Sequence, residues 1–200
     1  MSQTETKRYH HGDLRNALLR AGMEIIERDG LARLSLRALA AAVGVSHTAP
    51  KNHFGSMKGL VTAIGAQGFR KFAAEMRNGL TQASTRKERL HAATLGYVRF
   101  AQGHPELFKI MFSPDHCDRE DTAFKDAAQE SYRVLIEISE GLAWDKSEAP
   151  NAQKRTEIML WSFVHGYATL LNAGRIDDRA DGAPPPGILD IMPDFGYLDR

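Results

Sequence analysis

Residues 35–54 read SLRALAAAVGVSHTAPKNHF and predict two short helices joined by a tight turn. Ser35 is a favourable N-cap for the first helix, and the apolar residues after it recur at helical spacing. Gly44 can supply the turn, because glycine adopts left-handed backbone angles without a steric cost. The small side chain of Ala40 lets the second helix approach closely. Together these features are typical of a helix-turn-helix.

The second helix of this hairpin is expected to leave a polar face outward. Leu39, Val43 and Val45 would fill a small core beneath the two helices. The side chains then free to face a DNA major groove are His47, Thr48, Lys51 and Asn52. Because paired amphipathic helices around a glycine are common, an ordinary helical hairpin is the alternative interpretation of the same pattern.

The charge is distributed unevenly, although the net charge of the chain is only +1. Residues 1–58 contain nine Lys and Arg against five acidic residues, whereas the remainder contains 17 basic and 20 acidic residues. No acidic residue occurs between Asp29 and Glu75. A positive field of this kind suits a polyanion, although chance clustering on a solvated surface gives the same composition.

The rest of the chain predicts further helices and no strand, because alternating patterns and hairpin dipeptides are missing. A first helix is expected over 13–29, with Gly30 closing it in the left-handed conformation. Ser46 and Ser56 are the expected N-caps of two later helices. The helix over 56–78 contains glycines, which indicate either close approach of another helix or a soft segment.

The C-terminal half predicts a packed helical domain that begins after a polar junction at 81–88. Pro105 suits the first position of a helix, and apolar residues from Phe124 to Leu142 recur at the spacing of a long packed helix. A last strong helix is expected between Pro150 and Gly174. Its apolar side chains point all around the axis, so one of the surfaces covering it is expected to be another subunit.

Composition excludes several classes of protein. No run of 18 apolar residues is present, and the N-terminal residues lack the apolar stretch of a secretory signal. The single cysteine, Cys117, cannot form an internal disulfide and suits a reducing compartment. The expectation is a cytoplasmic protein without a membrane partner.

Four stretches resemble the TetR family of bacterial one-component regulators. RYHHGDLRNALLRAG at 8–22 and LRALAAAVGVSHTAPKNHFGSMKGL at 36–60 resemble its DNA-binding domain. HPELFKIMF at 104–112 and WSFVHGY at 161–167 resemble the C-terminal subclass named for a Trp-His-Gly motif. The resemblance covers roughly residues 8–172.

The resemblance implies an all-α fold in two parts. A three-helix DNA-binding domain with a helix-turn-helix is expected over 12–72, and an effector-binding and dimerisation domain over 84–200. The helix that follows Ser56 would be the connector between them. The helix between Pro150 and Gly174 would lie in a four-helix bundle formed by the last two helices of each subunit.

The function implied is that of a sequence-specific regulator of transcription, and not an enzyme. The expected partners are double-stranded DNA, a second copy of the chain and an unidentified small-molecule effector. Such a homodimer would repress from a palindromic operator and be released by the effector. No cofactor, catalytic group or metal is expected.

Two positions depart from the family pattern, which usually has an aromatic residue at Lys51 and a basic one at Met57. Lys51 can still neutralise a phosphate, and Lys58 can replace the missing cation. Pro50 also removes one backbone donor from the recognition helix. The residues predicted to contact DNA are Arg37, Ser46, His47, Thr48, Lys51, Asn52, His53 and Lys58. An arm of Lys7, Arg8, His10 and His11 enters the minor groove or is a solvated tail.

The C-terminal aromatic residues suggest an effector cavity, although such residues at helical spacing also form ordinary cores. The candidates are Tyr97, Phe100, Phe108, Met111, Phe112, Tyr132, Trp161 and His165.

Two chemical alternatives involve the loop around Cys117. Asp115, His116, Cys117 and Asp118 contain metal-binding groups, but four neighbours rarely point at one ion. Cys117 as a nucleophile, with His104 or His165 as its base, lacks an orienting third group. Two rival classes also stand beside a regulator: a helical carrier or enzyme that no longer binds DNA, and a non-specific architectural DNA protein.

Overall fold

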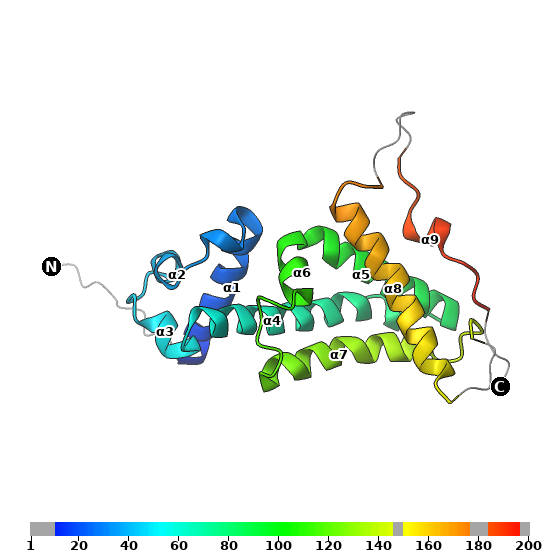
Figure 1. The fold of residues 1–200 in the computed structure, drawn as a ribbon, viewed down its shortest axis with the longest axis horizontal. Coiled ribbons are helices and arrows are strands. Elements are labelled where there is room, and N and C mark those ends of the chain that lie inside the picture. The colour runs from blue at the N-terminus through cyan, green and yellow to red at the C-terminus, as the bar shows by residue number, and fades with distance from the viewer. Residues whose placement is uncertain (1–10, 146–149, 177–183, 197–200) are drawn as a thin grey trace.

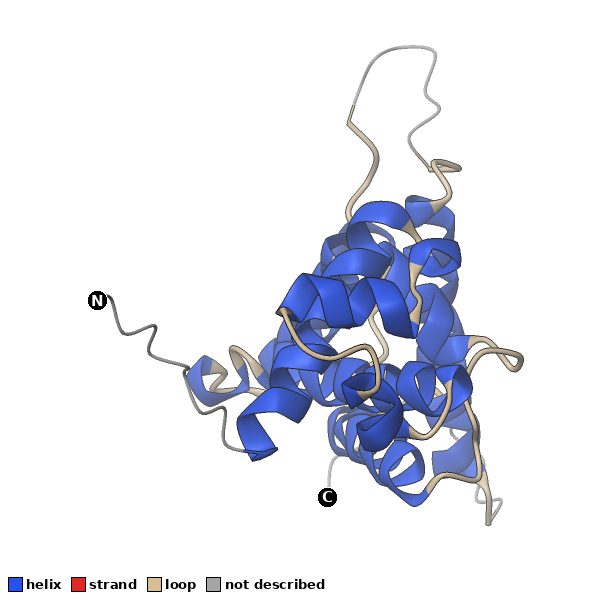
Figure 2. Cartoon of the chain, turned by 90° about the vertical axis from the view of Figure 1, so that its left-hand side faces the viewer, coloured by secondary structure: helices blue, strands red, loops and turns tan. Residues whose placement is uncertain are grey.

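The computed structural model describes residues 11–145, 150–176 and 184–196, and every regular element in these ranges is a helix (Figure 2). The predicted all-α class is therefore confirmed. The α-helices are α1 His11–Asp29, α2 Leu36–Val43, α3 Ala49–Phe54, α4 Met57–Arg77, α5 Arg86–Gly103, α6 Pro105–Phe112, α7 Thr122–Ser139, α8 Ala152–Asn172 and α9 Ile188–Ile191. Short 3₁₀ turns occur at Leu31–Arg33 and Leu80–Gln82.

The molecule is elongated, and α4 runs along its long axis (Figure 1). Helices α1, α2 and α3 gather around the N-terminal part of α4 at one end. Helices α5, α6 and α7 pack against the remainder of α4, and α8 packs against α5 and α7. Since α4 is a single continuous helix of 21 residues, it belongs to both ends of the molecule.

Local capping explains why α2 begins and ends where the sequence predicts. Ser35 is its N-cap, and the Ser35 Oγ accepts a hydrogen bond from the Ala38 backbone N–H at 3.0 Å. Gly44 ends the helix in the left-handed region, at φ 72° and ψ 35°. Ser56 caps α4 in the same way through the Gly59 N–H. Gly30 differs from the prediction, because it follows α1 at φ 81° but with an extended ψ of 163°.

The third helix begins later than expected, at Ala49 rather than directly after Ser46. Thr48 is its N-cap residue and makes no side-chain capping hydrogen bond. Pro50 explains the shift, because proline has no backbone N–H and is tolerated in the first turn of a helix but not in its interior. His47 and Thr48 therefore lie in the turn before α3 and not on the helix, which corrects the prediction.

The glycines of α4 allow close approach of other elements. A Cβ atom on Gly65 would lie 2.8 Å from the Cys117 Sγ and 2.9 Å from a ring carbon of Phe124. A Cβ atom on Gly68 would lie 2.6 Å from the Met111 Sδ. Of the two explanations for these glycines, the structure supports close packing.

The C-terminal helices differ from the expectation at the start of α8. Helix α8 begins at Ala152, two residues after Pro150, and it is followed by α9, which has only four residues. The four-helix bundle implied by the resemblance would use the two long helices α7 and α8 of each subunit, and it stays a prediction. The proline run that ends at Pro186 directly precedes α9 and prevents a longer helix there.

Candidate nucleic-acid interface and effector cavity

The hairpin of α2 and α3 presents its polar side chains to solvent. Leu39 and Ala40 on its inner side are buried against the core of the N-terminal helices. Seven of the eight predicted DNA contacts are exposed, and His53 is partly exposed. The exposed ones are Arg37, Ser46, His47, Thr48, Lys51, Asn52 and Lys58. None of them packs inward, so the geometry leaves this face free to meet a ligand as large as a DNA duplex.

The turn before α3 is held by its own side chains. The Ser46 and Thr48 hydroxyls are 2.8 Å apart, and the Ser46 Oγ accepts a hydrogen bond from the Thr48 N–H at 3.3 Å. The Ala49 N–H donates to the Ser46 carbonyl oxygen at 3.0 Å. Because these groups bind one another, the turn has a defined shape and fixes the direction in which α3 leaves the hairpin.

One cation near α3 was missed by the sequence analysis. The guanidinium carbon of Arg15, on α1, lies 5.3 Å from the centre of the Phe54 ring. Arg15 is exposed, so its charge remains accessible beside the end of α3. No sequence pattern singled out Arg15, because its position depends on how α1 crosses α3. The predicted N-terminal arm of Lys7, Arg8 and His10, with the His11 side chain, lies outside the described residues.

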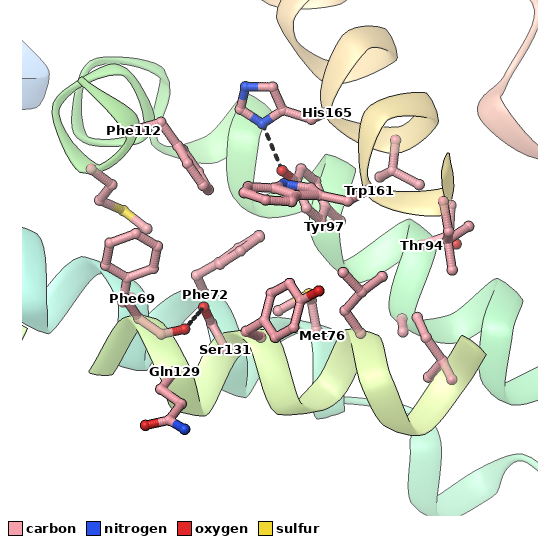
Figure 3. A pocket seen from close by; sticks show the side chains of 18 of the residues that line it. Phe69, Phe72, Met76, Thr94, Tyr97, Phe112, Gln129, Ser131, Trp161 and His165 are labelled. Atoms are coloured by element: carbon pink, nitrogen blue, oxygen red, sulfur yellow. Dashed lines mark hydrogen bonds between the residues drawn. The ribbon is translucent and has the colours of Figure 1, made fainter. Parts of the chain in front are cut away.

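A cavity of about 630 Å³ lies in the C-terminal part, lined by side chains from α4, α5, α6, α7 and α8 (Figure 3). Six of the eight predicted effector residues line it. They are Tyr97, Met111, Phe112, Tyr132, Trp161 and His165. Aromatic side chains dominate the wall, so the cavity suits a largely apolar molecule.

Phe100 and Phe108 do not line this cavity, which corrects their assignment to it. Both are almost fully buried, and their ring centres lie 5.1 Å and 6.4 Å from that of Phe72. They therefore form the aromatic core behind the wall. Helical spacing cannot separate the two roles, because a wall residue and a core residue can share one face of a helix.

Several lining residues were missed by the sequence analysis. Phe69, Phe72 and Met76 come from α4, the helix that also carries the DNA-binding hairpin. Arg119 and Lys125 bring positive charge to the part of the cavity near the start of α7. The remaining missed residues are Ala93, Thr94, Phe124, Ala128, Gln129, Ser131, Leu135, Ile138, Leu160 and Val164. For the residues on α7, the recurrence of apolar and small residues every three or four positions was an available signal.

The polar groups in the aromatic wall are partly paired with one another. The Tyr97 hydroxyl lies 2.7 Å from the His165 Nδ1, and the His165 ring centre lies 4.7 Å from that of Phe112. Burial lowers the pKa of His165 and raises the pKa of Tyr97, because a charged form is poorly solvated there. Both groups are therefore neutral at physiological pH, and the cavity wall they form carries no charge.

Tyr132 connects the cavity wall to a buried carboxylate on α8. Its hydroxyl donates to the Glu157 Oε2 at 2.6 Å, and the Lys154 Nζ lies 3.3 Å from the same oxygen. Burial, followed by the bond to Glu157, raises the pKa of the Tyr132 hydroxyl. This pair satisfies the buried carboxylate, which would otherwise be costly to keep from water.

The loop around Cys117 does not form the alternative chemical sites. The Cys117 side chain is buried, with its Sγ 3.8 Å from the carbonyl oxygens of Val61 and Ile110, whereas Asp115, His116 and Asp118 are exposed. Burial raises the pKa of the Cys117 thiol to about 11, which opposes formation of a nucleophilic thiolate. Among the described residues, no group of three or more His, Cys, Asp or Glu is placed to share a metal ion.

An exposed helix-turn-helix, joined by one helix to a cavity-bearing domain, defines the architecture of a DNA-binding regulator. Comparison with known families agrees. Residues 18–64 match the model of bacterial regulatory proteins of the tetR family, and residues 90–185 match that of the tetracyclin repressor-like C-terminal domain. No curated protein sequence matches the chain.

Solved structures show the same fold. A protein of unknown function from Rhodococcus sp. RHA1 is 31% identical, with a TM-score of 0.72 over 89% of this chain and 90% of that one. A TetR family transcription regulator from Marinobacter aquaeolei VT8 is 15% identical, with a TM-score of 0.59 over 84% and 87%. A TetR-like transcriptional regulator, also from Rhodococcus sp. RHA1, is 20% identical, with a TM-score of 0.55 over 84% and 89%.

The chain belongs to the TetR family of transcriptional regulators. Within the described ranges, no helix combines the length and apolar character needed to cross a membrane.

Proposed function

We propose that this regulator is a homodimeric repressor that a small apolar effector releases from a palindromic operator. The observation that carries the proposal is the dual role of α4. Its N-terminal part packs on the DNA-binding helices, where Ile64 contacts Gly22 of α1, and its C-terminal part supplies Phe69, Phe72 and Met76 to the cavity. A ligand in the cavity therefore touches the same helix that positions the hairpin.

The roles at the DNA face follow from the side chains. Arg37, Lys51 and Lys58 are exposed cations that neutralise phosphates, and Lys51 takes the place of the family's usual aromatic residue. Asn52 is exposed on α3 and carries the amide that can bind adenine through two hydrogen bonds. Ser46, His47, Thr48 and His53 complete the proposed contacts.

A second copy of the chain is proposed to cover the outer face of α8. Ile158 and Leu170 are 49% and 50% exposed, which is unusual for large apolar side chains on one helix. At about 100° per residue, Gly166 lies between these two positions around the helix, and a Cβ atom there would have no neighbour within 4 Å. A large apolar surface with an open glycine permits close packing of a symmetry-related helix.

The proposed Trp-His-Gly subclass gives α8 two functions. Trp161 and His165 line the cavity, while Gly166 opens outward. The motif would thus place ligand contacts and the dimer surface on neighbouring positions of one helix. The proposed domains over 12–72 and 84–200 would then be coupled through both α4 and the dimer.

DNA binding is tested with the full-length protein on the intergenic DNA beside its own gene. The proposal expects a footprint with two half-sites one helical turn apart, and an affinity that falls steeply with salt because bound phosphates release counterions. Weak binding that does not change with salt would contradict a DNA regulator and favour a carrier. Discrimination below about tenfold between the footprinted DNA and a random duplex would instead indicate an architectural protein.

The dimer is tested by Leu170→Glu, which places a charge on the proposed interface. Sedimentation is expected to show a dimer for the original chain and a monomer for the variant, with loss of operator binding. The matched control is Leu95→Glu, on an exposed apolar position of α5, which should leave the dimer intact. A monomeric original chain would contradict the proposal.

A further inference from the structure

The guanidinium group of Arg15, on α1, lies against the last residue of α3. Its central carbon is 5.3 Å from the centre of the Phe54 ring, and the Arg15 side chain is exposed. Figure 1 shows the first turns of α1 beside α3 and the start of α4, at the end of the molecule that carries the hairpin. The negative face of an aromatic ring attracts a cation, so Phe54 orients the Arg15 side chain.

The charge of Arg15 is not neutralised by a neighbouring carboxylate. Among the described residues, no acidic side chain forms an ion pair with Arg15 and no oxygen accepts a hydrogen bond from it. Arg28, near the other end of α1, differs because it pairs with Asp29 at 2.6 Å. Residues 30–74 contain no acidic residue at all, so α2, α3 and most of α4 cannot supply a partner. The positive charge of Arg15 is therefore available to an external anion.

The contact with Phe54 suits the binding of a phosphate. A guanidinium group carries five N–H donors in a fixed planar arrangement, and it can pack on an aromatic ring while two of these donors bind one phosphate. The ring also restrains the Arg15 side chain before any ligand arrives. Binding then costs less conformational entropy than it would for an unrestrained arginine.

Arg15 lies near two of the cations that are proposed to contact DNA. Lys51 precedes Phe54 by three residues, about one turn of α3, and Lys58 follows it in the first turn of α4. Both lysines are exposed. The three cations come from three helices that pack against one another, because α1, α3 and α4 are in mutual contact. Helix α1 is thereby placed to contribute to the same DNA-binding surface.

We infer that Arg15 is a DNA-binding residue, which binds one phosphate of the duplex backbone while Phe54 holds its side chain in place. Helix α1 thus takes part in the DNA interface directly, in addition to supporting the hairpin. A phosphate carries no sequence information, so Arg15 strengthens binding to every duplex and does not select the operator. The inference rests on the proposed function, because it requires that this end of the molecule binds DNA.

The test compares the full-length chain with Arg15→Gln on the footprinted operator and on a random duplex, over a series of salt concentrations. Arg15→Gln should bind both duplexes about three- to tenfold more weakly at about 0.1 M salt, and the slope of log affinity against log salt should fall by about one. Arg15→Lys should keep the slope, because the ammonium group retains the charge. The matched control is Arg28→Gln, about 20 Å along α1, which should change neither quantity.

The role of the ring is tested by a double-mutant cycle of Arg15→Gln and Phe54→Leu, measured as affinity for the random duplex. Phe54→Leu should weaken binding in the original chain and have no further effect once Arg15→Gln is present. Urea unfolding of each variant separates this coupling from a loss of stability. If Phe54→Leu does not fold, the salt slope of Arg15→Gln decides the assignment alone.

Three results with the variants would overturn the assignment. An unchanged salt slope in Arg15→Gln, with or without a loss of stability, would give Arg15 a packing role only. A loss confined to the operator would make Arg15 a reader of base edges instead. Additive effects in the cycle would show that Phe54 does not position Arg15. Failure of the original chain to bind any duplex would contradict the proposed function as well, whereas normal binding by both the original chain and Arg15→Gln would contradict this inference alone.

Discussion

The Glu27 carboxylate accepts a hydrogen bond from the Leu107 backbone N–H at 3.0 Å, so a side chain of α1 caps α6. The Glu106 N–H donates to the other carboxylate oxygen at 3.3 Å. The first backbone N–H groups of a helix have no partner within it and attract negative charge. Glu27 therefore links α1, at the DNA-binding end of the molecule, to α6, which contributes residues to the cavity lining.

Replacement of Glu27 by alanine should destabilise the fold by about 1–2 kcal/mol, because two helix N–H groups lose a charged acceptor. Urea unfolding measures the change. Glu24→Ala is the matched control, since Glu24 lies on the exposed side of the same helix. If the two variants are equally stable, the contact between α1 and α6 contributes nothing measurable.

Replacement of Lys51 by alanine should weaken binding to every duplex and lower the slope of log affinity against log salt by about one. The reason is the loss of one phosphate contact by an exposed cation of α3. Titrations at several salt concentrations test this prediction. Lys87→Ala, which removes an exposed cation from α5, should change neither quantity.

Replacement of Asn52 by alanine should instead cost about 1–3 kcal/mol on the operator and little on random DNA, because its amide is proposed to read a base edge. The measurement is a comparison of affinities for the two duplexes at one salt concentration. A parallel loss on both duplexes would give Asn52 a backbone role instead.

Replacement of Gly96 by alanine should destabilise the protein by about 3 kcal/mol or prevent folding, since this is the upper range for overpacking. The added Cβ atom would lie 2.2 Å from the Glu75 carbonyl oxygen, and this backbone contact cannot be relieved by a side-chain movement. Gly103→Ala, at the open end of the same helix, should be neutral or slightly stabilising. Thermal unfolding of both variants provides the comparison.

Stability should decrease as the pH falls below about 6.5, the ordinary pKa of histidine, in part through His165. Burial lowers the pKa of His165 in the folded protein, so the unfolded chain binds the proton first. In the window between the two pKa values, unfolding takes up a proton, and stability rises with pH. His165→Gln should flatten the curve of unfolding free energy against pH there; parallel curves would show that His165 contributes nothing.

Much of the N-terminal fold could be predicted because it is specified locally. Ser35, Gly44 and Ser56 cap helices through their own neighbours, so their roles are visible in the sequence. The start of α3 was placed too early, because Ser46 is a suitable cap but Pro50 fixes the first turn. Local competition between two good signals therefore limits the prediction of boundaries.

The cavity could be predicted only in part. Aromatic residues on α5, α6 and α8 were identified as candidates. Phe108, which was predicted to line the cavity, lies in the core, whereas Phe72, which was not predicted, lines the cavity. Which face of each helix meets the cavity depends on how α4 crosses α5 and α7, and this crossing has no local signal. Thr94 was missed for the same reason, since a lone threonine in an apolar helix gives no indication that it lines a cavity.

Because α4 is one unbroken helix, a tilt at one of its ends moves the other end as well. Its 21 residues span about 32 Å at 1.5 Å per residue. A tilt of about 5° at the cavity would move the opposite tip by about 3 Å, close to the length of one base-pair step. In a two-fold assembly the N-terminal ends of both α4 helices would move together. A small change around a bound ligand would then alter the distance between the two α2–α3 hairpins, so that it no longer matches one turn of DNA.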